Sequence, residues 1–395
     1  MSLLLLTLLN LFNYLDRYVI AGVLPRIEAE FGVSHAQAGL LGSLFIGIYM
    51  VASPLGGYLS DRFPRRFVAA GAALLWSLAT LGSGLSGSFA ALLVARAFIG
   101  LGEAGYGTVA PALLCDLYPR ERRSTALSIF YVAMPLGAAL GYGLGGAFSE
   151  GGAWRQAFLI AGIPGLLLAA WALRLPEPPR GAADGLPDLG KVPFGEALRL
   201  LRRNGRFWLN TAGQTLMTFS VGGLAFWMPT FLERERGMAA SQAGLGVGAV
   251  TAAAGIAGTL VGGWLGARWS RRASEAGLLL SGVAFALAAV PMVGSALFRS
   301  PALIFGSIFL SLFLVFISTG PINAALMEAV APSVRGFAMG LSILVLHLLG
   351  DALSPPLIGW IAQRASFGAA VLLNAVPLFL GGAVLWVGAR KLGSC

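Results

Sequence analysis

The chain contains 395 residues, of which 57% are hydrophobic and 11% charged, and its formal net charge is +10. This composition excludes a soluble globular domain, because apolar runs of about 20 residues recur along the chain and each is long enough to span a bilayer as a helix. We therefore expect an all-α polytopic membrane protein. In such a protein the positive charge indicates basic loops that face anionic membrane lipids, and we expect no nucleic-acid partner.

The apolar runs predict twelve transmembrane helices. They fall near residues 2–25, 36–59, 67–86, 89–117, 123–148, 154–175, 207–232, 241–266, 275–297, 301–330, 336–362 and 367–389. The spacing predicts two six-helix bundles, 1–175 and 207–395, joined by a linker over 176–206. Because prolines open this linker, the sixth helix should stop there. Residues 194–206 are basic and amphipathic, which predicts either a helix on the membrane surface or a plain tether.

The distribution of lysine and arginine predicts the orientation. If the N-terminus is cytoplasmic, the inner loops and tail hold 19 basic residues and the outer loops six. This asymmetry predicts a multi-pass protein of the inner (plasma) membrane with both termini in the cytoplasm. Because the chain begins almost directly in the first helix, we expect that a short cytoplasmic tail has been trimmed.

An internal repeat relates the two halves. The predicted loop after the second helix reads GGYLSDRFPRR over residues 56–66, and the loop after the eighth reads GGWLGARWSRR over residues 262–272. Two bundles repeated in the same orientation indicate transporter architecture with alternating access. We expect a monomer.

Two adjacent opposite charges, Asp16 and Arg17, interrupt the first apolar run. A charge at the bilayer centre costs roughly 2.5–3.5 kcal/mol, so these residues should face the protein interior or a water-filled path. Neighbouring helical positions point about 100° apart, so at least one of the two needs a partner on another helix. The fourth helix offers Arg96 and Glu103, seven positions apart and on one face.

These four charges suggest a proton switch, because a change of pairing can bind or release a proton. We expect Asp16 as the main protonatable group and Glu103 as the second, with Arg17 or Arg96 holding an anionic head group. The alternative is a permanent ion-pair network that packs the two helices together.

The eleventh helix carries His347 and Asp351, four positions apart and on one face. We expect Asp351 to take part in coupling or gating and His347 to contact substrate, the alternative being a packing role for the histidine. Tyr131 and Gln214 are predicted to offer neutral hydrogen bonds to a polar head group, although such residues also join helices. In the fifth helix, Gly137, Gly141 and Gly145 recur every four positions, which close helix packing explains.

The first copy of the repeated loop resembles a motif of the major facilitator superfamily, Gly-x-Leu-x-Asp-Arg-x-x-Arg-Arg. The matching residues are Gly57, Leu59, Asp61, Arg62, Arg65 and Arg66. The resemblance implies that this loop forms a gating latch, which in the family stabilises the outward-facing state. The second copy has Ala267 in place of Asp61 and lacks the carboxylate.

Several segments resemble the Spinster family of lysolipid and sphingosine-phosphate transporters within that superfamily. They are NYLDRYVIAGVLPRIEAEF (13–31), ARAFIGLGEAGYGTVAPALLCDLYP (95–119), SIFYVAMPLG (128–137), LPEPPRG (175–181) and HLLGDALSPPLIG (347–359). The family's important charged positions match Asp16, Arg17, Arg96 and Glu103. The resemblance implies a bacterial-type member that moves an anionic, lipid-like substrate with protons.

An enzyme is excluded because the chain has no HExxH, Gly-x-Ser-x-Gly or CxxC motif. With two histidines and two cysteines in the chain, we expect no metal, no cofactor and no disulfide framework. The sequence therefore predicts a secondary transporter of a lysophospholipid or a sphingosine-1-phosphate-like amphiphile. The alternative within the same fold is a transporter of a small organic anion or a drug-like amphiphile.

Overall fold

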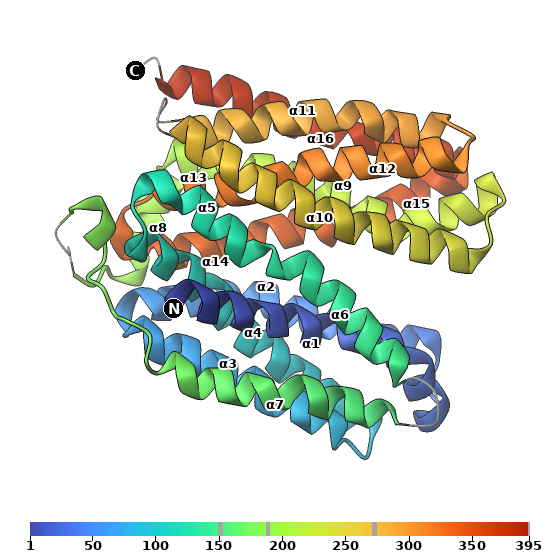
Figure 1. Cartoon of the computed structure of the whole chain (residues 1–395), viewed down its shortest axis with the longest axis horizontal. Helices are drawn as coiled ribbons and strands as arrows, with labels where there is room; N and C mark the ends of the chain where they lie inside the picture. The colour runs from blue at the N-terminus through green and yellow to red at the C-terminus, as the bar shows by residue number, and fades with distance from the viewer. Residues whose placement is uncertain (149–152, 187–189, 271–274, 394–395) are drawn as a thin grey trace. The chain divides into compact units, whose positions relative to one another are not determined.

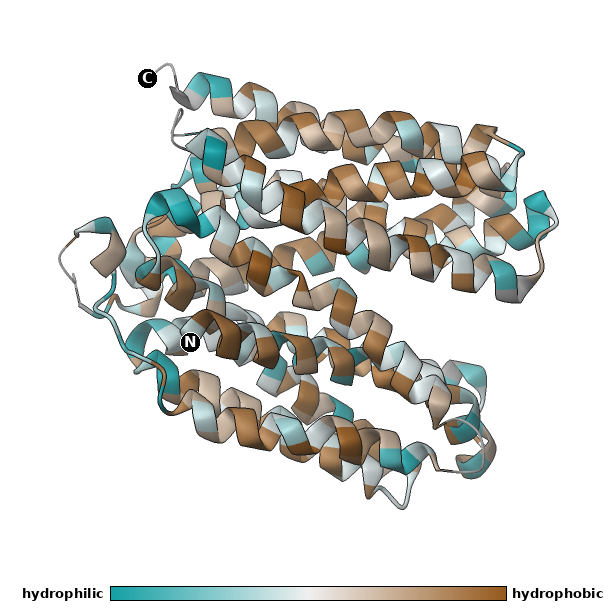
Figure 2. Ribbon diagram, in the orientation of Figure 1, coloured by the Kyte–Doolittle hydropathy of each residue, from teal (hydrophilic) through white to brown (hydrophobic). Residues whose placement is uncertain are grey.

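The computed structural model describes residues 1–148, 153–186, 190–270 and 275–393. Within these residues it contains twelve helical spans that are long and apolar enough to cross a membrane, which confirms the predicted all-helical class. Figure 2 shows hydrophobic residues along the middle of the helices and hydrophilic residues at their ends, as expected of helices that cross a bilayer. Arg271 and Arg272 of the second repeat copy lie outside the described residues.

The first six spans are built from seven helices (Figure 1). These are α1 (Ser2–Phe31), α2 (His35–Arg62), α3 (Arg65–Gly84), α4 (Phe89–Leu117), α5 (Arg120–Tyr131), α6 (Ala133–Ala147) and α7 (Trp154–Ala172). The linker contains a 3₁₀ turn (Ala182–Asp184) and α8 (Phe194–Arg202).

The remaining spans are built from α9 (Gly205–Arg236), α10 (Ala240–Ser270), α11 (Ala276–Leu297), α12 (Pro301–Ile317), α13 (Thr319–Glu328), α14 (Arg335–Leu346), α15 (Ser354–Arg364) and α16 (Phe367–Gly393). A 3₁₀ turn (Pro332–Val334) precedes α14, and a π-helical turn (His347–Asp351) follows it.

Local sequence signals set several helix ends. Ser34 caps α2 in a capping box, in which its side chain accepts from the Gln37 backbone and the Gln37 side chain accepts from the Ser34 backbone. Gly32 ends α1 with a φ of 63°, in the left-handed region that favours glycine. The prediction that α1 ends at Pro25 was wrong, because the helix runs on to Phe31 and keeps that proline in its interior.

Three spans that were predicted as single helices are interrupted, at Val132, at Ser318 and between Asp351 and Ser354. Each interruption lies three to four residues before a proline: Pro135, Pro321 or the Pro355-Pro356 pair. Proline lacks the N–H that would bond the carbonyl four residues earlier, so the helix is weakened at that point. The three breaks are therefore explained by the backbone hydrogen bonds that these prolines cannot make.

The described chain divides into two compact units. The first comprises 1–117, 133–197 and 331–341, and the second comprises 118–132, 198–330 and 342–395. Each unit thus takes a short segment from the other half of the sequence: α5 belongs to the second unit, and the first residues of α14 belong to the first. The predicted halves 1–175 and 207–395 remain a prediction about the moving bodies.

Within the first unit, α6 packs along α1, and α3 lies beside both α4 and α7 (Figure 1). The α1–α6 contact depends on glycines, because a Cβ on Gly137 or Gly141 would come within 2.6 Å of the carbonyl oxygens of Leu11 or Leu15. Close packing therefore accounts for the glycine spacing. The contact also fixes the part of α1 that carries Asp16 and Arg17.

Within the second unit, α16 packs against α9 and α11, and α10 packs against α5 and α12. The large apolar core of this unit includes Phe231, Phe285, Met292 and Leu378, none of which is more than 1% exposed. At the start of α9, Asn204 caps the helix by accepting from the Phe207 backbone at 3.0 Å.

Candidate transport site and loop latch

Arg17 on α1 forms an ion pair with Glu103 on α4 inside the first unit. Its Nη2 and Nε donate to one oxygen of Glu103 at 2.7 and 3.1 Å. Glu103 is fully buried, and the Arg17 side chain is 14% exposed. This pair confirms the prediction that one of the two adjacent charges on the first helix finds its partner on the fourth.

Aromatic rings surround the Arg17 guanidinium, which lies 4.8, 5.0 and 4.7 Å from the ring centroids of Tyr14, Phe45 and Tyr49. The ring faces carry negative potential and stabilise a cation without neutralising it. Arg17 is therefore held by one carboxylate and an aromatic cage, a more rigid setting than the sequence alone indicated.

Asp16 has a different environment. It is 1% exposed, and one oxygen accepts a hydrogen bond from the Thr80 hydroxyl on α3 at 2.9 Å. The other oxygen has no hydrogen-bond partner among the described residues. The arginine next to it in sequence is already paired with Glu103, so Asp16 is a buried carboxyl group with one neutral partner.

Arg96 lies on a buried face of α4 and is only 1% exposed to solvent. Its Nε donates to the Leu41 carbonyl at 3.4 Å, and its guanidinium lies 4.6 Å from the Phe45 ring centroid. Within the described residues its Nη1 atom has no hydrogen-bond partner. The first unit therefore holds a buried guanidinium with unused donor capacity close to the ring that also contacts Arg17.

The second unit carries the predicted neutral groups in two pairs. Gln214 donates to Asn210 at 2.6 Å, and Asn210 donates to the Ile322 carbonyl at 2.9 Å. Tyr131 lies at 3.5 Å from the Oδ1 of Asn323, a long contact. The Asn210 bond joins α9 to α13, and the Tyr131 contact joins α5 to α13. In this structure these uncharged polar residues therefore hold helices together, which is the alternative to a role in binding substrate.

His347 and Asp351 are also brought together in the second unit. The Nδ1 of His347 lies 2.6 Å from the Oδ2 of Asp351 across the π-helical turn. This turn lies directly against α9, where a Cβ on Gly222 would come within 2.7 Å of the Asp351 carboxylate. Single π-turns inside helices are frequent at functional sites.

The predicted loop over 56–66 is mostly helical, because α2 runs to Arg62 and α3 begins at Arg65. The last turn of α2 contacts the start of α14 through Asp61. Its two carboxylate oxygens accept from the backbone N–H groups of Gly336 and Phe337 at 2.9 and 2.8 Å. A carboxylate at a helix N-terminus satisfies free N–H groups and interacts favourably with the helix dipole. Gly57 permits the approach, because a Cβ there would overlap the Gly336 carbonyl.

A second carboxylate, Asp116 at the end of α4, lies beside this contact. It forms ion pairs with Arg65 at 2.5 Å and with Arg335 at 2.7 Å. All three side chains are at most 3% exposed. Two guanidinium groups and one carboxylate are thus buried together, and Arg335 also reaches Asp184 in the linker at 2.8 Å.

The contacts of Asp61, Arg65 and Asp116 with the start of α14 are here named the latch. Of the predicted motif residues, the structure brings Gly57, Asp61 and Arg65 into it. It does not bring in the other two arginine side chains. Arg62 donates to the Tyr58 hydroxyl at 2.7 Å, and Arg66 stacks on the Phe67 ring at 4.8 Å.

The sequence reasoning missed Thr80, Phe45 and Tyr49 around the charges on α1 and α4, and it missed Asp116 in the latch. The sequence did contain a signal for Asp116, because this aspartate lies at the end of an apolar run, where a charged residue is costly and usually functional. The aromatic residues carried no such signal, because rings are common in any spanning helix.

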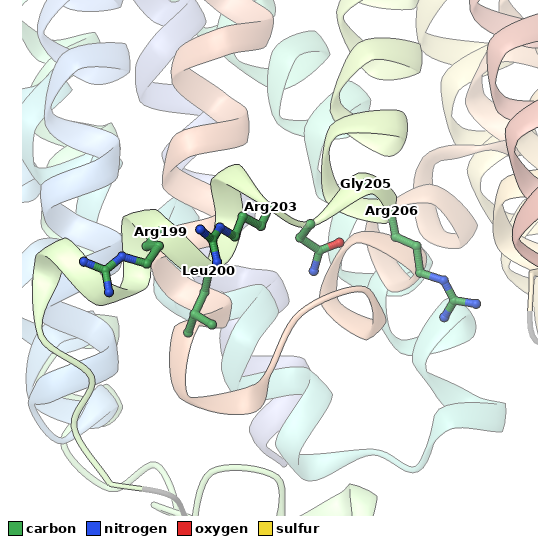
Figure 3. A pocket seen from close by; sticks show the side chains of 6 residues that line it. Arg199, Leu200, Arg203, Gly205 and Arg206 are labelled. Atoms are coloured by element: carbon green, nitrogen blue, oxygen red, sulfur yellow. The ribbon is translucent and has the colours of Figure 1, made fainter.

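Arginines gather where α8 meets α9 in the second unit (Figure 3). Arg199, Leu200, Arg203, Asn204, Gly205 and Arg206 line a hollow of about 510 Å³ there. Arg206 forms an ion pair with Glu275. Among the described residues, Arg199 and Arg203 make no ion pair. The hollow lies far along the chain from the charges on α1 and α4 and consists of linker residues.

Comparison with known proteins agrees with this fold. Residues 6–350 match the Major Facilitator Superfamily, so the chain belongs to that class of membrane transporters. The chain is 37% identical over 386 residues to human protein spinster homolog 1, covering 90% of this chain and 71% of the relative. It is also 32% identical to Drosophila melanogaster protein spinster, covering 91% of this chain and 61% of the relative. Within the superfamily, the chain belongs to the Spinster family.

Solved structures give the same result. A crystal structure of a bacterial homologue of the human lysosomal transporter Spinster, inward-facing and unoccupied, has a TM-score of 0.67 and 26% identity, and covers 99% of this chain and 96% of its own. The Escherichia coli fucose:proton symporter has a TM-score of 0.79 at 18% identity, covering 99% and 98%, and shows the shared fold alone. The protein is therefore a secondary transporter of the major facilitator type and not an enzyme.

Proposed function

We propose that the protein moves a lysophospholipid or a sphingosine-1-phosphate-like amphiphile across the inner (plasma) membrane by proton-coupled alternating access. The observation that carries this proposal is the buried charge set on α1 and α4 in a Spinster-family chain. A buried arginine with unused donors suits an anionic head group. In this proposal both termini are cytoplasmic, and the halves 1–175 and 207–395 move as bodies joined by 176–206.

We propose Asp16 as the main proton carrier, with Glu103 and Asp351 as further coupling groups. Asp16 has one neutral hydroxyl partner, whereas Glu103 is held by Arg17. A buried carboxyl group outside an ion pair is better able to change its protonation state than one that is paired. The groups that act on Asp16 are Thr80, Glu103 and Arg96.

Arg96 and Arg17 are the proposed head-group ligands in the first unit, and Arg96 is the stronger candidate because Arg17 is already paired. Tyr131, Gln214 and His347 are the proposed polar ligands that the second unit contributes. All three now have protein partners, so their use in binding requires those contacts to open.

The substrate is tested with purified protein in liposomes. Uptake of a fluorescent or radiolabelled lysophospholipid, and of sphingosine-1-phosphate, is measured with and without an imposed pH gradient. We expect a pH gradient to accelerate transport of at least one of them. If the protein moves only short water-soluble anions or drug-like amphiphiles from a broad panel, the alternative substrate class is correct and the lysolipid proposal fails.

Coupling is tested with Asp16→Asn, which keeps the hydrogen bond from Thr80 possible but removes the ionisable group. We expect transport down a substrate gradient to persist and acceleration by a pH gradient to disappear. Thr80→Val is the matched control, because it removes the hydroxyl and leaves the carboxyl group. Unchanged pH dependence in folded Asp16→Asn would remove Asp16 from this role.

For the linker, we propose that α8 lies on the membrane surface. Ala197 and Leu201 are 1% exposed while Arg199, Arg202 and Arg203 point outward, and each exposed basic residue contributes about 1 kcal/mol to attraction by anionic lipid. Arg199→Gln/Arg203→Gln should therefore lose part of the thermal stabilisation by phosphatidylglycerol. Arg122→Gln/Arg174→Gln removes the same charge elsewhere and serves as control; equal losses in both would favour the plain tether.

A further inference from the structure

The first part of the linker follows the latch inside the first unit. Glu177 accepts from the backbone N–H of Arg66 at 3.1 Å, and the Arg180 side chain donates to the carbonyls of Ser60 and Phe63, both at 3.3 Å. Residues 177–184, here named the strap, are thus fastened to the end of α2, which carries Asp61, and to the start of α3. A plain tether would need none of these bonds.

The strap also reaches the buried charges of the latch. The Gly181 N–H donates to Asp116 at 3.0 Å, and Asp184 accepts from Arg335 at 2.8 Å. Arg335 is buried, and an ion pair on each side favours the charged guanidinium in such a site. Asp116 supplies one carboxylate from α4 and Asp184 supplies the other, so Arg335 keeps both partners only while the strap is attached.

The backbone of the strap is shaped for this position. Gly181 has a φ of 81° and Gly185 a φ of 66°, on either side of the 3₁₀ turn Ala182–Asp184. Both values favour glycine. A Cβ on Gly181 would lie 3.0 Å from the Pro332 ring, just before α14, so a larger residue would push the strap away.

We propose that the strap is a third component of the latch, with Asp184 as a positioning residue for Arg335. Release of α14 from Asp61 and Asp116 then requires the strap to detach, and detachment of the strap weakens the hold on α14. This inference rests on the proposed alternating access, because α14 continues beyond residue 341 into the second unit. The linker would thereby bias which conformation the transporter occupies.

The first test measures latch opening after a change in the strap. Cys115 is buried and precedes Asp116 on α4, so its alkylation by N-ethylmaleimide in the intact protein, followed by mass spectrometry, reports loss of cover at the latch. We expect Asp184→Asn to raise the alkylation rate about tenfold, because the side chain can still accept from Arg335 but no longer carries the charge that pairs with this buried guanidinium. Asp184→Glu keeps the carboxylate and should restore most of the protection.

The control for this test is Glu196→Gln, an acid-to-amide change at an exposed position of α8. It should leave the alkylation rate unchanged. Asp61→Asn is the positive control, because it weakens the cap on α14 directly. Each variant must elute as a single species and show a cooperative thermal transition, so that opening is distinguished from unfolding.

The second test uses the reciprocity that coupled equilibria require. If the strap and latch are one device, Asp61→Asn should free the strap and speed tryptic cleavage after Arg180 relative to cleavage after the exposed Arg174. In a tether that is independent of the latch, the ratio of the two cleavage rates would not change.

The proposal is overturned if Asp61→Asn raises Cys115 alkylation while Asp184→Asn behaves like Glu196→Gln, or if the Arg180 cleavage ratio is the same in Asp61→Asn and the unaltered protein. Neither assay contains substrate. A failure of the strap therefore differs from a failure of the proposed function, which would appear only in the liposome assays.

Discussion

The two copies of the repeated motif lie at the ends of α2 and α10, and both allow close helix packing, but with different chemistry. In the first unit, Gly57 lets α2 approach the carbonyl of Gly336, and Asp61 accepts from two N–H groups at the start of α14. In the second unit, the equivalent Gly263 lets α10 approach Ser128 on α5, and Thr125 donates to its carbonyl at 3.1 Å. Ala267 stands where Asp61 would be.

The difference extends to the neighbouring acidic residues. Asp116, at the end of α4, is buried between two arginines, whereas Glu328, near the end of α13, forms a 2.9 Å pair with Arg120, whose side chain is 43% exposed. The first copy therefore depends on buried charges, whose pairing can change between states. The second copy depends on packing and a surface pair.

The largest effect that separates the copies is expected from Asp116→Asn. This change leaves Arg65 and Arg335 buried without their shared carboxylate, and removing one partner of a buried pair costs about 3–5 kcal/mol. Thermal unfolding of purified protein and the transport rate should both fall strongly. Glu328→Gln is the matched control and should cost about 0–1 kcal/mol, because exposed pairs contribute little. Equal losses of thermal stability in the two variants would contradict the view that buried charges stabilise the first copy more than the second.

A smaller difference is expected between Gly57→Ala and Gly263→Ala. The new methyl group at residue 57 meets backbone atoms of Gly336, which cannot move aside, whereas at residue 263 it meets mainly the Ser128 side chain. Overpacking typically costs about 1–3 kcal/mol. We expect Gly57→Ala near the top of that range and Gly263→Ala near the bottom, measured as the free energy of unfolding in detergent. The reverse order would show that the second copy has the tighter contact.

The sequence predicted the part of this architecture that hydropathy and local chemistry determine. Twelve spans, the repeat and the partner of Arg17 on the fourth helix all follow from apolar length, spacing and the cost of a charge in lipid. The breaks in the spans were only partly predictable. Pro135 weakens its helix and Pro25 does not, because neighbouring helices decide whether the lost bond bends the chain.

The sequence did not predict the latch partners. Asp116 and Arg335 are 219 positions apart, and no local pattern links them. Asp184 lies in a polar linker, where an acidic residue is ordinarily solvated. Their association depends on the first residues of α14, which come from the second half of the sequence but pack in the first unit. This placement is a result of tertiary packing, and the hydrophobic periodicity of the sequence does not reveal it.

The comparison can be sharpened by giving the second copy its missing carboxylate. Ala267→Asp places a negative charge near the start of α5, since the neighbouring Gly266 already contacts Ser124, the fifth residue of that helix. A charge at a helix N-terminus contributes about 0.3–1 kcal/mol. We expect a modest rise in thermal stability and slower transport, with Ala267→Asn as the uncharged control. No difference between the aspartate and asparagine variants would show that the second copy cannot form a charged latch.

The smallest effect is expected at His35, whose side chain is 95% exposed and pairs with Glu28 at the surface. Its Nδ1 lies 2.9 Å from the Glu28 carboxylate, and this hydrogen bond, with the negative charge, raises the pKa of His35 above its ordinary value. A raised pKa means that the pair stabilises the folded state at acidic pH and that this contribution is lost as the pH rises through the raised value. Because water screens the pair, His35→Gln should leave both the thermal transition between pH 5 and 8 and the pH dependence of transport unchanged within error. A clear loss of pH dependence in this variant would place a proton-sensitive group at the start of α2 and would weaken the assignment of coupling to Asp16.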